Sequence, residues 1–75
     1  SIFEIDLPSK WENKTLLEIN PRGKYGMNIL TVKRGSQVIS KLDGNFIFES
    51  GDQIVVFGNA DQIFAFTNKN DKKKK

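Results

Sequence analysis

The first strand of this chain is predicted by a strict alternation of apolar and polar residues. In the run IFEIDL (residues 2–7), Phe3, Ile5 and Leu7 fall on one side and two carboxylates fall on the other. A period of two with one polar face is typical of a half-buried β-strand. Pro8 and Ser9 end this strand.

A short helix is predicted from the run NKTLLEIN (residues 13–20). Thr15 and Glu18 have the spacing of a capping box, and the leucines and isoleucine supply a buried side. The helix must be short, because Pro21 pushes the residue before it out of helical dihedral angles.

The next run, NPRGKYG (residues 20–26), predicts a single capped helical turn. Asn20 suits the N-cap, and Pro21 suits the first helical position. Gly26 suits a left-handed exit from the turn. The turn would direct the chain into the strand that follows.

The rest of the pattern predicts four further strands and one helix. Gly35–Ser36 is a hairpin signal, and Asn59 with Gln62 predicts a second capping box that opens the helix ADQIFAFTNK (residues 60–69). The resulting order is β-α-β-β-β-β-α. It predicts an α+β domain with helices on a mainly antiparallel sheet. The four strands are expected at residues 27–35, 37–40, 46–49 and 53–58.

Length and charge divide the chain into a domain and a tail. Seventy-five residues make one small domain, and no Cys or His is present to reinforce it. The formal charge of +3 arises from the run KNDKKKK (residues 69–75), since the other residues sum to a slightly negative charge. We therefore predict a folded domain over residues 1–68 and a charged, disordered tail over residues 69–75, and we expect no nucleic-acid partner.

Catalysis is not predicted. The chain has no His for acid–base chemistry and no Cys nucleophile, and its carboxylates are scattered over turns and exposed strand faces. Gly23 and Gly26 are too closely spaced for a nucleotide-binding loop. We predict no catalytic residue, no metal and no cofactor.

Arg22 and Asn28 are the candidate binding residues. Arg22 lies at the start of the short turn, where backbone N–H groups are free, and an arginine can hold a phosphate with two hydrogen bonds. Asn28 is polar at the start of an apolar strand, where its amide either contacts a base or stabilises the turn. Physical reasoning from these residues favours the structural roles over a binding site.

Four features in order resemble the C-terminal domain of RCK proteins, also called the TrkA-C domain. They are the alternating acidic first strand, the NKTLLEI helix, the turn and strand RGKYGMNILTVKR, and the strand SGDQIVVFG. The resemblance runs from about Phe3 to Phe66. It implies a two-fold dimer within a regulator of potassium or cation transport, located in the cytoplasm at the inner face of the membrane.

One branch of this family, in Ktr-type potassium uptake systems, binds cyclic di-AMP at the dimer interface. The resemblance implies that Arg22, Asn28 and Ile29 contact this ligand, with Leu17 and Ile19 lining the cleft. It also implies a membrane-embedded channel or transporter subunit as a partner of the parent protein. Cyclic di-AMP would be a regulatory ligand.

Two functional readings stay open from the sequence. The first is a module that senses cyclic di-AMP, which Arg22 and the pair Asn28–Ile29 favour. The second is a structural dimerisation module of a gating ring or antiporter tail that binds no small ligand. Two departures from the family pattern favour the second reading: Lys41 replaces a proline, and Asn20–Pro21 replaces an acidic–aliphatic pair.

Overall fold

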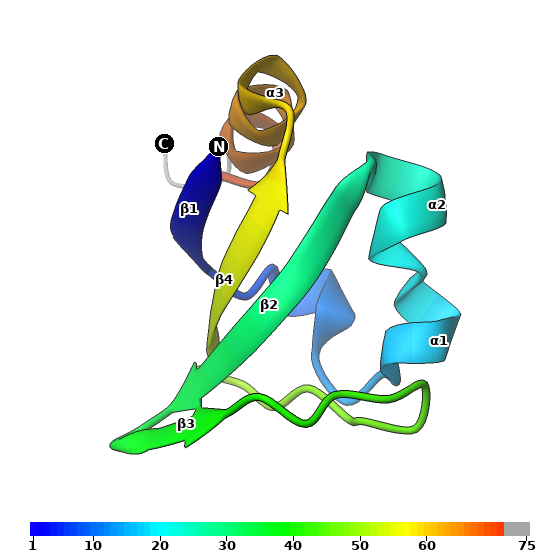
Figure 1. Cartoon of the computed structure of the whole chain (residues 1–75), viewed down its shortest axis with the longest axis vertical. Helices are drawn as coiled ribbons and strands as arrows, with labels where there is room; N and C mark the ends of the chain where they lie inside the picture. The colour runs from blue at the N-terminus through cyan, green and yellow to red at the C-terminus, as the bar shows by residue number, and fades with distance from the viewer. Residues whose placement is uncertain (72–75) are drawn as a thin grey trace.

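Four antiparallel strands form one sheet in the order β1-β4-β2-β3 (Figure 1). The computed structural model describes residues 1–71. β2 is the longest strand and crosses the whole molecule, with β4 on one side and the short β3 on the other. The strands are β1 (Ile2–Asp6), β2 (Met27–Arg34), β3 (Gln37–Ile39) and β4 (Gln53–Gly58).

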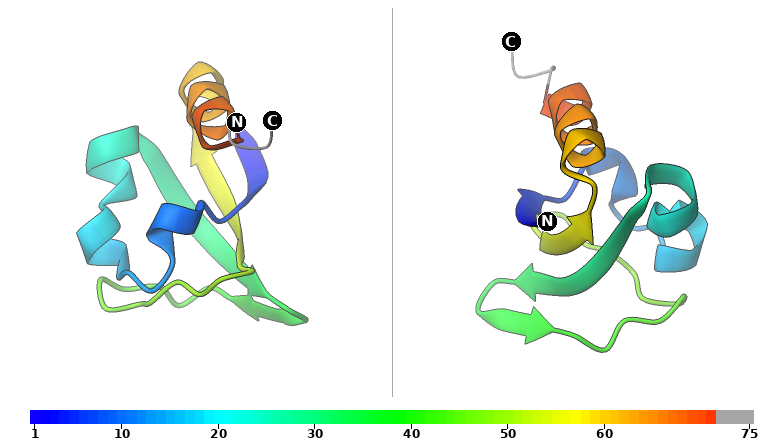
Figure 2. Two further views of the ribbon diagram at one scale, coloured as in Figure 1. Left: turned by 180° about the vertical axis from the view of Figure 1, so that it is seen from behind. Right: turned by 45° about the horizontal axis from the view of Figure 1, so that its top comes forward.

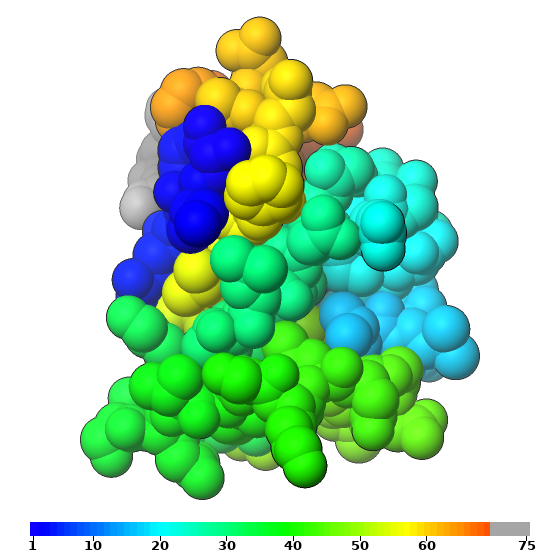
Figure 3. All heavy atoms as spheres, viewed as in Figure 1, coloured from blue at the N-terminus to red at the C-terminus, as the bar shows by residue number. Residues whose placement is uncertain are grey.

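The helical elements gather on one face of this sheet. Seen from behind, they lie over the face turned toward the viewer (Figure 2), whereas the space-filling view of the opposite face shows β1, β4 and β2 without a helix over them (Figure 3). The α+β class and the antiparallel sheet predicted from the sequence are confirmed. The helices are η1 (Ser9–Trp11), α1 (Leu16–Ile19), α2 (Pro21–Tyr25) and α3 (Ala60–Asp71).

The hydrophobic core lies between the sheet and the helices. Trp11 is its largest member, and its ring packs against Tyr25, Phe48 and Phe66 at centroid distances of 5.5–5.8 Å. Aromatic contacts of this kind stabilise a core beyond the effect of buried area alone. The buried apolar residues are Leu7, Trp11, Ile19, Met27, Val32, Phe48, Ile54, Val56, Ile63 and Phe66.

A β-bulge at Leu30 sets which side chains of β2 face the core. Ile29 pairs with Val56 and Thr31 pairs with Val55, so Leu30 is an extra residue on this strand. Met27 and Val32 are both fully buried although they are five residues apart. In a regular strand an odd spacing places two residues on opposite faces, so the bulge is what brings both into the core.

The structure differs from the prediction in two places, a predicted strand and the end of the last helix. Residues 46–49 were expected to form a strand, and that prediction is wrong: the segment makes one isolated bridge, between Ile47 and Thr15, outside the sheet. Residues 69–71, the first residues of the predicted tail, belong to α3, which continues through Asp71. The remainder of that tail, residues 72–75, lies outside the described residues.

Arg34 holds the segment that was expected to be a strand. Its guanidinium donates two hydrogen bonds of 2.8 Å to the buried carboxylate of Asp52, and it also reaches Glu49 and the carbonyl of Ile47. The backbone N–H of Glu49 donates to the same Asp52 carboxylate at 2.9 Å. We call these contacts the Arg34 network. It satisfies a charge that would otherwise be costly to bury.

Candidate ligand-binding site

The turn that carries Arg22 is fixed by local sequence. The capping box at Thr15 and Glu18 is present, with both reciprocal hydrogen bonds, and it starts α1. Asn20 then takes the left-handed conformation, with φ of 51°, and its side chain accepts a hydrogen bond from the N–H of Gly23. Asparagine tolerates this backbone better than most residues, and here it ends one helix while capping the next.

Pro21 and Gly26 occupy the places predicted for them. Pro21 is at the start of α2, and Gly26 ends α2 in the left-handed region with φ of 68°. Gly23 is explained as well, because a Cβ at this position would collide with the Asn20 side chain that caps the turn. The sequence therefore defines the direction in which the chain enters β2.

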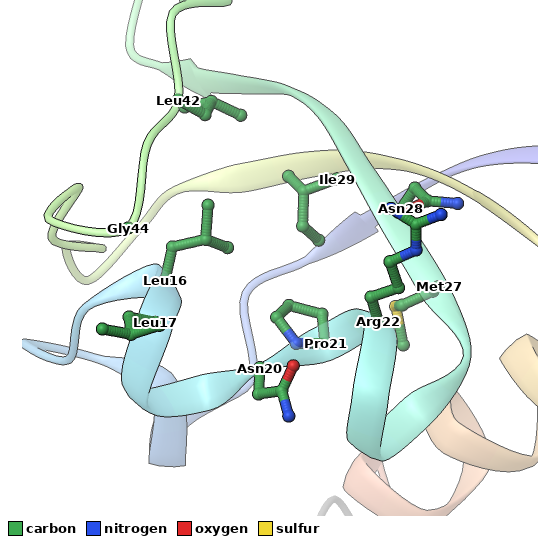
Figure 4. Close-up of a pocket in the computed structure, with 10 residues that line it drawn as sticks. All are labelled: Leu16, Leu17, Asn20, Pro21, Arg22, Met27, Asn28, Ile29, Leu42 and Gly44. Carbon is green, nitrogen blue, oxygen red and sulfur yellow. The ribbon is translucent and has the colours of Figure 1, made fainter.

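A pocket of about 310 Å³ opens between this turn, the start of β2 and the loop after β3 (Figure 4). Residues from three separate parts of the chain meet here, so the pocket depends on the tertiary fold. Its lining residues are Leu16, Leu17, Asn20, Pro21, Arg22, Met27, Asn28, Ile29, Leu42 and Gly44.

The polar end of the pocket is formed by Arg22 and Asn28. Both side chains line the pocket, Arg22 from α2 and Asn28 from β2 (Figure 4). Arg22 is exposed, and its guanidinium forms no hydrogen bond or ion pair with any described side chain. An arginine with free donors next to an amide can receive an anionic, hydrogen-bonding group.

The apolar end is formed by Leu16, Leu17, Ile29 and Leu42. The wall that contains Leu42 is held against α1 by backbone hydrogen bonds. The N–H of Leu17 donates to the carbonyl of Gly44 at 3.0 Å, and the N–H of Leu16 donates to that of Phe46 at 2.9 Å. These bonds use the free N–H groups at the start of α1, so they close the pocket and satisfy the helix end together.

Four of the five predicted site residues line the pocket: Arg22, Asn28, Ile29 and Leu17. Ile19 does not. It is 5% exposed and belongs to the hydrophobic core. Lys41, which stands where the family pattern has a proline, is exposed and does not line the pocket, whereas its neighbour Leu42 does.

Sequence reasoning missed Leu16, Met27, Leu42 and Gly44. Gly44 lies close to α1, since a Cβ added there would be 3.4 Å from the Cβ of Leu17, but this contact is visible only in the structure. Nothing in the local pattern around Leu42 indicates that this loop returns to α1.

Other kinds of site are not seen among residues 1–71. No group of three His, Cys, Asp or Glu side chains in this part of the chain is arranged to hold a metal ion. Within the same residues, no helix has the length and apolar character needed to cross a bilayer.

A comparison with protein families matches residues 1–70 to the TrkA-C domain. The chain belongs to the TrkA-C family. Domains of this family are regulatory and non-catalytic, which agrees with the prediction that the chain is not an enzyme.

One curated relative of this TrkA-C domain is the Ktr system potassium uptake protein C of Bacillus subtilis (strain 168). The two are 46% identical over 39 residues, which is 52% of this chain. The matched region spans 18% of the relative's length, so the chain corresponds to a minor part of that protein.

Two solved structures have the same fold. The RCK C domain of the potassium transport protein KtrA, in complex with cyclic di-AMP, has a TM-score of 0.83 and 28% identity, covering 92% of this chain and 81% of that one. The RCK_C domain dimer of BusR from S. agalactiae, in complex with the same ligand, has a TM-score of 0.78 and 20% identity, covering 95% and 96%. The second likeness concerns the fold only.

Proposed function

We propose that this TrkA-C domain is a ligand-sensing regulatory domain that binds cyclic di-AMP in the pocket beside Arg22. The observation that carries the proposal is a guanidinium at one end of the pocket, unpaired among the described side chains, with apolar side chains at the other end. The likeness to the KtrA domain, which was solved with cyclic di-AMP, supports it.

The two ends of the pocket suit the two parts of such a ligand. A phosphate would accept hydrogen bonds from Arg22, and the Asn28 amide would bind beside it. An adenine would pack on the apolar side chains of Leu16, Ile29 and Leu42. A mostly apolar pocket with a few placed polar groups is the usual composition of a small-molecule site.

The symmetry of the ligand supports a homodimer. The pocket of about 310 Å³ lies at the lower limit of the roughly 300–1,000 Å³ found for ligand sites. Two such pockets facing each other across a two-fold axis would each hold one half of a dinucleotide with two equivalent phosphates. Each Arg22 would then contact one phosphate.

The proposed place of the domain is a bacterial potassium or cation transport system. The identity with the Ktr potassium uptake protein and the likeness to KtrA support this assignment. The domain would act on the cytoplasmic side through its parent protein, which would contact the membrane-embedded channel or transporter. Ligand binding would change the dimer and so control transport.

A structural dimerisation module that binds no small ligand is the second candidate. The observation that favours it is the uncovered face of the sheet, where Ile2, Leu30 and Phe57 are 63%, 43% and 48% exposed. An exposed apolar patch of this kind favours a protein partner whether or not a ligand is present.

Calorimetric titration with cyclic di-AMP separates the two candidates. We expect saturable binding of one ligand per two chains, with much weaker binding of ATP and of a linear di-adenosine dinucleotide, because neither presents two symmetric phosphates. A dimer that gives no heat with cyclic di-AMP would reject the sensing function and leave the structural module.

A further inference from the structure

A second groove, separate from the ligand pocket, lies between α2 and α3. These two helices are neighbours in the fold (Figure 1), and the space between them measures about 450 Å³. The groove is made by the outer side of the turn that carries Arg22 and by one side of α3. Its lining residues are Arg22, Gly23, Lys24, Tyr25, Gly26, Gln62, Ala65, Phe66 and Lys69.

Three cationic side chains line this groove, and no described carboxylate does. Arg22, Lys24 and Lys69 are all exposed, and none forms an ion pair with a described side chain. The two cations of β2 differ from them, since Lys33 is paired with Glu4 and Arg34 with Asp52. Three unpaired positive charges in one groove make the local electrostatic potential positive. A bound anion would relieve their mutual repulsion, so the groove favours an anion.

This concentration of charge is local. Over residues 1–71 the carboxylates slightly outnumber the lysines and arginines, so the body of the domain is not basic. A cationic groove on a nearly neutral body attracts anions at one place, whereas a generally basic surface attracts them everywhere.

The floor of the groove is made of aromatic rings, and the fluorescence of one of them can be used to detect binding in the groove. The rings of Tyr25 and Phe66 meet edge to face at 5.0 Å, and Trp11 packs beneath both. The Trp11 Nε1 atom is buried without a hydrogen-bond partner among the described residues, which is unusual for a buried indole. Trp11 is the single tryptophan of the chain, so its fluorescence is sensitive to changes under the groove.

We propose that the α2–α3 groove is a second binding site, for a small soluble anion with at least two negative charges, such as the polyphosphate of a phosphorylated metabolite. Lys24 and Lys69 would bind it from the two helices, and the Gln62 amide, on the same side of α3, would donate a hydrogen bond. The proposal does not depend on cyclic di-AMP binding.

The two sites share Arg22, which lines both. One guanidinium cannot donate all its hydrogen bonds to a phosphate in the pocket and to an anion in the groove at the same time. An anion in the groove would therefore weaken ligand binding in the pocket. Coupling between two sites is reciprocal, so a ligand in the pocket would weaken anion binding by the same factor.

The test uses the full chain and inorganic pyrophosphate, with sodium chloride at equal ionic strength as the blank. Calorimetry and Trp11 fluorescence measure binding to wild type, to a Lys24→Gln/Lys69→Gln variant, and to a Lys10→Gln/Lys41→Gln control whose exposed lysines line neither site. We expect the groove variant to bind pyrophosphate about tenfold more weakly or worse, and the control to match wild type. Equal weakening in both variants, or no saturable binding to wild type, would overturn the proposal.

Two further measurements identify the source of the anion and the coupling. Sedimentation with phosphatidic acid vesicles, against phosphatidylcholine vesicles, tests the same chemistry in a lipid headgroup. If Lys24 and Lys69 are needed for binding to the phosphatidic acid vesicles but not for binding pyrophosphate in solution, the proposal of a soluble ligand is wrong. The second measurement is cyclic di-AMP binding in the presence and absence of pyrophosphate. The groove variant should bind cyclic di-AMP with the wild-type affinity, but pyrophosphate should no longer weaken that binding. If wild type shows no such inhibition, the shared role of Arg22 is wrong.

Discussion

At the scale of single residues, Arg22 differs from its neighbours in what it contributes to folding. Asn20 caps α2, Pro21 is buried, and Gly26 ends the helix, so each of them stabilises the turn. The Arg22 side chain is exposed and makes no contact of this kind with a described residue. Its donors are therefore available for the ligand contact proposed above.

Arg22→Ala should weaken cyclic di-AMP binding by about a hundredfold or more. Hydrogen bonds to charged groups contribute about 1.5–3 kcal/mol each, and the dimer would lose one set for each phosphate. The melting temperature should barely change, because the side chain is exposed. Calorimetry and thermal melting measure both effects, and the matched control is Lys24→Ala, two residues further along α2 and outside the pocket. Equal affinity in wild type and Arg22→Ala would remove this residue from the site.

Asn20→Ala should destabilise the domain by about 1–2 kcal/mol, because it removes a helix cap and places a residue with a Cβ in the left-handed region. Asn20→Gly keeps the backbone conformation accessible and should cost only a few tenths of a kcal/mol from the cap. Urea unfolding gives both values. Equal losses in the two variants would show that backbone strain at Asn20 is not significant.

The residues of this turn show how far the sequence can predict the site. The cap, the first proline and the left-handed glycine have local signatures, and all three were placed correctly. Ile19 was assigned to the cleft by family resemblance, but it lies in the core. The sequence could not show this, because a four-residue helix is too short for its periodicity to indicate which side faces inward. Leu42 could not be predicted, since its position depends on a contact between distant parts of the chain.

At the scale of elements, the segment from Gly44 to Asp52 is held by contacts at both ends and by a single bridge between them. Its first part bonds to the start of α1, and its last part belongs to the Arg34 network. A strand was predicted at residues 46–49, but the segment belongs to no strand of the sheet and forms only the bridge to Thr15. Its phenylalanines pack against the core, with Phe48 fully buried, so burial explains these apolar residues without a place in the sheet.

Arg34→Ala should destabilise the domain by about 3 kcal/mol, since removing one partner leaves the buried Asp52 charge unpaired. Lys33→Ala is the matched control on the same strand. Its ion pair with Glu4 is 44% exposed on both sides, and pairs of this kind contribute at most about 1 kcal/mol. Urea unfolding compares the two. Similar losses would show that the Arg34 network contributes no more than a surface pair.

The same network predicts a loss of stability in acid. Burial acts to raise the pKa of Asp52, but hydrogen bonds from Arg34 and from the Glu49 N–H outweigh it, and the pKa lies below its ordinary value. A lowered pKa gives stability that is present above the unfolded-state value of about 3.9 and is lost as the pH falls through the folded-state value. The free energy of unfolding should therefore fall below about pH 4.

Asp52→Asn isolates this effect. The variant lacks the titrating group, so its free energy of unfolding, although lower overall, should change less steeply with pH in the acid range than that of wild type. Urea titrations over a pH series measure the slopes. An unchanged slope would assign the acid sensitivity to other carboxylates, such as Glu18, whose pKa is lowered by hydrogen bonds from Thr15.

At the scale of the whole molecule, the uncovered sheet face continues into the ligand pocket. Ile2 pairs with Phe57, and Phe57 pairs with Asn28, so an exposed apolar row ends at the polar side of the pocket. A second copy packed on this row would bring its own Arg22 close to the first. Dimerisation and ligand binding would then use one continuous surface.

The domain should sediment as a dimer at micromolar concentration, and cyclic di-AMP should increase the dimer fraction by mass action. Phe57→Ser should shift the equilibrium toward monomer and weaken ligand binding together, whereas Phe64→Ser, which changes an exposed ring on α3, should change neither. Sedimentation velocity measures both variants. A wild-type monomer at all concentrations, with and without ligand, would contradict the dimer.

The bulge at Leu30 also limits how this domain can change in evolution. It divides β2 into a half that carries Asn28 and Ile29 and a half that carries the Arg34 network. Deleting Leu30 would leave Met27 and Val32 four residues apart, and an even spacing keeps both on the core face of a regular strand. Relatives that lack this one residue should therefore keep the same core without the bulge. A one-residue insertion or deletion elsewhere in β2 would instead turn part of the strand over, because side chains alternate along a strand, and it should be eliminated.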